Sequence, residues 1–156
     1  MAGARGDVAR VDRDHLTLVG QFGWAWLAAT MALALHVADE ATHDFLAWYN
    51  PRALRIRRFF GGLPFPPTFT FWPWLIGLTA AVLLLVAMTF SAFAGERRLQ
   101  SVAYFLSVIH IANGLLHLGA SVAARRSVPG VLSAPLLLVT GIWLAYAAAH
   151  LPEVAT

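Results

Sequence analysis

Four apolar stretches dominate this sequence, and each is long enough to cross a lipid bilayer. They occupy residues 17–43, 72–94, 99–123 and 129–150, whereas a bilayer-spanning helix needs roughly 20 apolar residues. Hydrophobic residues make up 59% of the chain and charged residues only 12%, well below the roughly 25% typical of soluble domains. Because lipid offers no partners to backbone polar groups, the sequence predicts an all-α membrane protein with four transmembrane helices.

The connections between these stretches predict how the helices are arranged. The second and third connections are short, which favours antiparallel neighbours in an up-down bundle. The first helix is long and extends to about Tyr49, where Asn50-Pro51 is expected to end it. We therefore expect one four-span domain over 17–150 with a surface loop at 50–71, between a polar head at 1–16 and a tail at 151–156.

Charge and cysteine content exclude several classes of function. All basic residues are arginines, and most lie at the ends of the predicted spans, where arginines anchor helices to lipid headgroups. No water-facing element remains that could bind nucleic acid. The chain has no cysteine, which excludes disulfides, thiolate nucleophiles and cysteine-based metal sites. We expect a multi-pass integral membrane protein with the lipid bilayer as its partner.

Two clusters of polar residues interrupt the apolar stretches: His36, Asp39, Glu40, His43 and Asp44 near the end of the first, and His110, Asn113 and His117 in the third. Ionisable side chains at membrane depth are costly and mark functional sites. At about 100° per residue, positions three, four and seven apart share one face of a helix. Each cluster therefore forms a stripe about two turns long.

The two stripes are predicted to meet at one site. In an up-down bundle the first and third spans run in the same direction, and both stripes lie in the second halves of their spans. We expect His36, Glu40, His43, His110 and His117 to bind one or two metal ions. Imidazole with carboxylate suits zinc or iron rather than calcium or magnesium. In the same site, Glu40 or Asp39 is a candidate general base, and Asn113 and Asp44 are candidate supporting ligands.

These residues resemble the HXXEE family of small bacterial integral membrane proteins. The name motif would be His36-Val37-Ala38-Asp39-Glu40, with Asp39 where the name has Glu. The later Asn113-x-x-x-His117 and Pro129-Gly130 are also similar to the family pattern, and the resemblance covers roughly residues 25–145. It implies a multi-span helical protein, placed in the bacterial inner membrane, with an intramembrane His/Glu site. It implies no particular reaction.

Several functions are compatible with such a site. The first is a membrane metalloenzyme acting on an apolar small molecule, by hydrolysis, hydration or isomerisation with zinc and by oxidation with a di-iron pair. Others are a bis-histidine haem protein for electron transfer, a transporter of metal or protons that would need a homo-oligomer, and a lipid-binding module without metal. The carboxylates beside the histidines argue against haem.

Overall fold

The computed structural model describes the backbone of residues 2–152 and the side chains from Leu16 onward. This part of the chain forms six α-helices and no β-strand: α1 (Ala2–Thr42), α2 (Phe45–Phe59), α3 (Phe71–Ala87), α4 (Thr89–Phe93), α5 (Arg98–Ala124) and α6 (Ala134–Ala149). The prediction of an all-α fold is confirmed. Met1 of the predicted head and residues 153–156 of the predicted tail lie outside the described residues.

Three helical segments are long and apolar enough to cross a membrane: Leu16–Thr42, Phe71–Phe93 and Arg98–Ala124. The fourth predicted span is shorter, because α6 has 16 residues and is therefore about 24 Å long, against a hydrocarbon core of about 30 Å. It begins at Ala134 rather than near 129. Gly130 takes a left-handed φ of 83° in the preceding turn, and Pro135 lies in the first helical turn, where its missing N–H is not needed.

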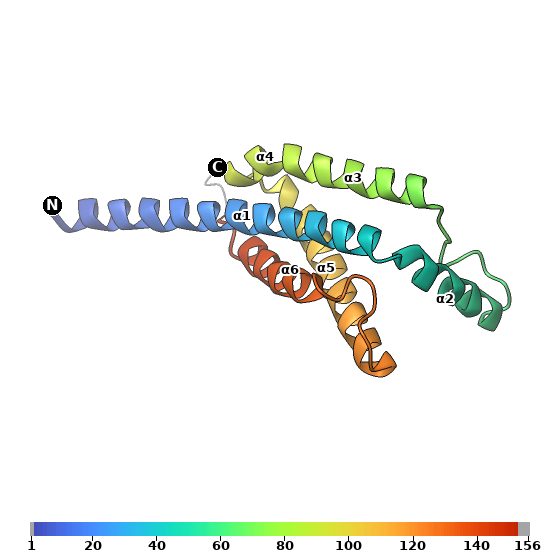
Figure 1. Ribbon diagram of the computed structural model, residues 1–156. Helices are drawn as coiled ribbons and strands as arrows, with labels where there is room; N and C mark the ends of the chain where they lie inside the picture. Colours follow the sequence, from blue (N-terminus) through green and yellow to red (C-terminus); the bar gives the residue numbers. More distant parts are fainter. Residues whose placement is uncertain (1, 153–156) are drawn as a thin grey trace.

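Helix α1 is the axis on which the other helices pack (Figure 1). Helix α3 runs back along one side of it, whereas α5 begins beside α4, crosses α1 and packs against α6 on the other side. A Cβ on Gly114 would lie 2.9 Å from the carbonyl oxygen of Ala134, so glycine lets α5 approach α6 closely. In α3 only Trp74 and Leu85 are buried. A closed four-helix bundle stays a prediction.

The apolar core lies beside the middle of α1, one or more turns before the polar stripe. Buried residues from α1, α3, α4, α5 and α6 form it, among them Phe22, Trp26, Leu85, Leu99 and Leu144. The indole of Trp26 donates a hydrogen bond of 3.0 Å to the carbonyl of Leu85, which ties α3 to α1. This core fixes the helices at one end and leaves their polar stripes to meet at the other.

The first helix breaks before Tyr49, which differs from the prediction. Helix α1 ends at Thr42, and α2 begins at Phe45. The Thr42 hydroxyl donates to a carbonyl of the preceding turn at 2.7 Å, and Asp44 takes a left-handed φ of 53°, which aspartate tolerates better than most residues. Such side-chain bonds to the backbone compete with helix continuation. After the break, α2 continues past the end of α1 at an angle to it (Figure 1).

The prediction that Asn50-Pro51 ends a helix is wrong, because Pro51 lies inside α2. The loop after α2 is correspondingly shorter, covering 60–70 instead of 50–71. Two side chains hold it against the helix. The Asn50 amide bonds to both backbone groups of Phe69, at 2.9 and 3.1 Å, and Arg57 donates to the carbonyl of Pro66 at 2.6 Å.

Candidate metal centre

Three ligand-type side chains meet between α1 and α5. His36, Glu40 and His117 are buried, with 1, 5 and 3% of their surface exposed. One ligand atom from each lies within 4.8 Å of the others. Glu40 Oε1 is 3.4 Å from Nε2 of His36 and 3.1 Å from Nε2 of His117. Two imidazole nitrogens therefore converge on a single carboxylate oxygen.

The helices explain this convergence. His36 and Glu40 are four residues apart on α1 and share one face of it. His117 reaches them from α5, and its ring meets the His36 ring edge-on, with centroids 4.9 Å apart and planes at 76°. Phe45 and Trp48 of α2 lie against the other side of the His117 ring, at centroid distances of 5.9 and 6.1 Å. The break after α1 therefore brings α2 over the site.

A chain of hydrogen bonds orients the His36 ring. The Ser133 hydroxyl donates to Asp39 Oδ2 at 2.7 Å, and the backbone N–H of Ser133 donates to the same oxygen at 3.0 Å. The Ser133 Oγ is also 2.8 Å from Nδ1 of His36. Because the hydroxyl hydrogen points to the carboxylate, Oγ accepts from Nδ1–H of His36. A carboxylate acting on a ligand histidine through its second nitrogen is the usual arrangement around protein metals.

This chain of bonds determines what the other nitrogen of His36 can do. With the proton on Nδ1, Nε2 carries a lone pair. It faces the Glu40 carboxylate at 3.4 Å, and the Asn113 amide donates to it at 3.0 Å. A nitrogen lone pair and a carboxylate oxygen repel each other at this distance unless a proton or a metal cation lies between them. The donor set thus fits a metal ion.

The loop before α6 closes over both histidine rings. A Cβ on Gly130 would lie 2.6 Å from Cε1 of His117 and 2.9 Å from Cε1 of His36. Only glycine fits there, because the space is filled and the φ is positive. The backbone of this loop is fixed by Ser133 at one end and by the Ser121 hydroxyl, which accepts from Val128 N–H at 3.1 Å, at the other.

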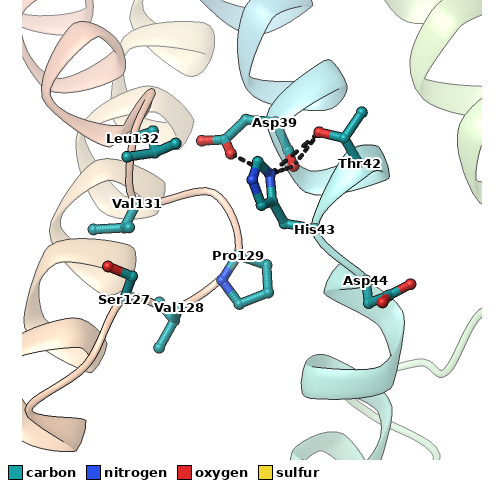
Figure 2. A pocket seen from close by; sticks show the side chains of 9 residues that line it. All are labelled: Asp39, Thr42, His43, Asp44, Ser127, Val128, Pro129, Val131 and Leu132. Atoms are coloured by element: carbon teal, nitrogen blue, oxygen red, sulfur yellow. Dashed lines mark hydrogen bonds and ion pairs between the residues drawn. The ribbon is translucent and has the colours of Figure 1, made fainter.

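His43 and Asp44 are not part of the buried group, although the sequence analysis assigns both to the site. His43 lies past the last helical turn of α1, its side chain is 52% exposed, and its Nδ1 contacts Asp39 Oδ1 at 3.0 Å. It lines a separate cavity of about 590 Å³ between the end of α1 and the loop before α6. Figure 2 shows Asp44 pointing away from that loop. The helix break removes both residues from the stripe that faces α5.

His110, another ligand assigned from the sequence, also lies outside the group. It is fully buried, and among the described residues neither of its ring nitrogens has a hydrogen-bond partner. Its Cβ lies beside Gly141 of α6. Seven residues of helix separate it from His117 by about 10.5 Å along α5, so the two rings do not reach one ion.

Sequence reasoning missed Ser133 and the direct contact of Gly130 with both rings. Both residues lie in the segment that was assigned to the fourth helix. The available signal was Pro129-Gly130 followed by a serine just before Ala134-Pro135. Glycine and proline in this order indicate a turn, and a serine before proline indicates a helix start.

The fold and the group together define a class of protein: a small helical chain with candidate membrane spans, in which two buried histidines share one carboxylate. The chain belongs to the family described as proteins of unknown function with an HXXEE motif, whose model matches residues 24–144. The resemblance expected from His36–Glu40 is therefore confirmed. Comparison with curated proteins and with solved structures gives no match.

Proposed function

We propose that His36, Glu40 and His117 hold one transition-metal ion, zinc or iron, and that the protein is a membrane metalloenzyme acting on an apolar or lipid-like small molecule. One observation carries the proposal: the buried nitrogens of two histidines from two helices converge on one carboxylate oxygen, all within 4.8 Å. Buried ionisable groups are costly unless they are paired or bound to a metal, which favours a functional reason for the group.

The donor set supports a single ion. Two histidines and one glutamate are the protein ligands of many catalytic zinc sites, which keep a fourth position open. Two histidines and one carboxylate also bind iron(II) in oxygen-dependent enzymes. A di-iron centre in a helical protein uses several carboxylates, whereas Glu40 is the one carboxylate among the grouped residues.

The surrounding residues have distinct roles in this proposal. A bound ion supplies an activated water and a Lewis acid, for hydrolysis, hydration or isomerisation with zinc and for oxidation with iron. Asn113, which donates to His36 in the structure, would instead donate to a substrate oxygen once Nε2 binds metal. The free oxygen of Glu40 is the candidate general base. Asp39 acts through Ser133 on His36, so we assign it a positioning role.

The geometry weighs against the haem alternative. The His36 and His117 rings touch edge-on at 4.9 Å between centroids, which leaves no space for a porphyrin between them. A transporter of metal or protons remains the second candidate, because it would use the same buried donors. Metal flux into proteoliposomes that disappears in His117→Gln, with no turnover of any lipid, would favour transport over catalysis.

Elemental analysis of the purified full-length protein tests the proposal. Wild type should contain, or take up, about one equivalent of zinc or iron, and His36→Gln and His117→Gln should each lose it. His43→Gln is the matched control and should keep it, since His43 lies outside the group. A folded wild type that binds neither metal would overturn the proposal, as would a His117→Gln variant with unchanged metal content.

A further inference from the structure

Another cavity lies between α2 and α5, and His117 lines it. We call it the α2–α5 cavity. Its volume is about 260 Å³, near the lower end of small-molecule sites, which begin at roughly 300 Å³. It is lined mainly by apolar and aromatic side chains, with Phe45, Trp48 and Ala53 on one wall and Leu116 and Ala120 on the other. This volume accommodates part of one hydrocarbon chain and is too small for two chains side by side.

The α2–α5 cavity reaches the candidate metal centre. His117 and Asn113 both line it, and both also contact the buried group, through Glu40 and His36 respectively. The Trp48 ring stacks on the His117 ring at 27°. A chain inside the cavity would therefore lie against the His117 and Asn113 side chains.

Arg52 gives the cavity a positively charged mouth. It lines the cavity and is exposed. Its guanidinium lies 4.2 Å above the Trp48 ring and donates one hydrogen bond to the Trp48 carbonyl, which holds the charge in place. Among the described residues no carboxylate lines this cavity. The remaining guanidinium N–H groups can donate to an anion.

Two other lining residues are hydrogen-bond donors. The indole N–H of Trp48 is buried without a partner within the described part of the chain, and buried polar groups of this kind are rare. Tyr49 also lines the cavity. Burial raises the pKa of Tyr49 above its usual value, so at neutral pH its phenol keeps its proton and can donate. An anionic group at the mouth would supply acceptors.

The cavity of Figure 2 has the opposite character. Asp39, His43 and Asp44 line it, and its two carboxylates would repel an anion. Charge therefore distinguishes these two cavities, and an anionic molecule is directed to the one beside Arg52.

We propose that the α2–α5 cavity binds a single-chain amphiphile of the long-chain carboxylate class, with its head at Arg52 and its chain against Trp48 and His117. The proposal rests on the proposed function, because it names the substrate class of the same centre. Four features of the α2–α5 cavity support it: the lining is mainly apolar, one guanidinium is fixed at the mouth, no carboxylate is among the lining residues, and His117 of the proposed metal centre is in direct contact.

Photo-crosslinking in nanodiscs of neutral phosphatidylcholine tests the proposal. The probes are oleate carrying a diazirine on its chain and the matched oleyl alcohol. We expect oleate to label α2 or the end of α5 about tenfold or more above the alcohol, the scale of a charge-assisted hydrogen bond. Arg52→Gln should remove this preference, whereas Arg55→Gln, the control from the same helix outside the cavity, should keep it. Ala120→Phe should block labelling by both probes.

The outcomes separate this proposal from the metal centre, since metal content is measured on the same samples. Three results would each overturn the carboxylate site. They are equal labelling by oleate and the alcohol, an unchanged preference for oleate in Arg52→Gln, and labelling confined to the exposed surface of α3. Metal retained beside any of these results would leave the metal centre standing. Specific oleate labelling of protein that cannot bind metal would overturn the metal centre and keep the cavity.

Discussion

Replacing Gly130 with alanine tests whether the loop before α6 sets the positions of the His36 and His117 rings, the proposed metal ligands. The added Cβ would lie 2.6 Å from Cε1 of His117 and 2.9 Å from Cε1 of His36. Ordinary contact begins at 3.4 Å, so the nearest ring atom must retreat by 3.4 − 2.6 = 0.8 Å. The loop has little freedom to move instead, because Asp39 holds Ser133 by two hydrogen bonds.

The expected effect on metal affinity follows from this displacement. Ligand positions in metal sites hold to about 0.2 Å, so a shift several times larger pulls a nitrogen out of range. We expect metal affinity to fall by about 10- to 100-fold or more, because losing a residue that merely supports a metal ligand already has an effect of that size. The φ of 83° at Gly130 adds a separate backbone cost of about 1–2 kcal/mol for any residue with a Cβ.

Gly62→Ala is the matched control, because it separates the two effects. Gly62 has a φ of 86°, and an added Cβ would meet nothing within 4 Å. Competition with a chromogenic zinc chelator gives the affinity of each variant, and unfolding in denaturing detergent gives its stability. Gly62→Ala should lose stability but bind zinc as wild type does. Wild-type zinc affinity in a folded Gly130→Ala protein would refute the reasoning.

Three further predictions concern the same centre. Asp39→Asn should weaken zinc binding about 10- to 100-fold. Adding Ser133→Ala to this variant should weaken zinc binding little further, because both residues act along one path to His36. Fully additive losses of zinc affinity in chelator competition would contradict this path. His110→Phe should keep its metal, and its free energy of unfolding in detergent should rise by up to about 1 kcal/mol, because the change removes buried nitrogens without partners. Loss of metal in this variant would instead make His110 a ligand. Protons compete with metal for imidazole and carboxylate ligands, so zinc affinity, and the stability that zinc adds, should be present at about pH 8 and decline toward about pH 5. Zinc affinity that is independent of pH would contradict imidazole ligation.

Helix periodicity was sufficient to predict the central pair of the site. His36 and Glu40 are one turn apart on a single helix, and such pairs share a face whatever the rest of the fold does. The short connections also predict that α1 and α5 run in the same general direction, and in the structure α5 brings His117 to 3.1 Å from Glu40. Local helical geometry and connection lengths are both properties that a single sequence contains.

The positions of the other two predicted ligands, His43 and His110, depend on features that helix periodicity does not predict. The rule placed His43 on the stripe because it assumed that the helix continues, whereas side-chain bonds to carbonyls and a left-handed Asp44 end α1 before it. His110 does lie on the α5 helix, but its Cβ lies against Gly141 of α6. Which neighbour a helix face meets is decided by tertiary packing, and therefore a single sequence does not settle it.

The shortness of α6 has a consequence for the surrounding bilayer. At 16 residues it is about 6 Å shorter than the hydrocarbon core of an average membrane. The backbone of the non-helical segment before α6 is bonded at Val128 to Ser121 and at Ser133 to Asp39, which is what irregular backbone close to lipid requires. Lipids beside α6 would have to thin to match it. The metal centre would then lie only a short distance from the water on that side, although it is enclosed by apolar helices.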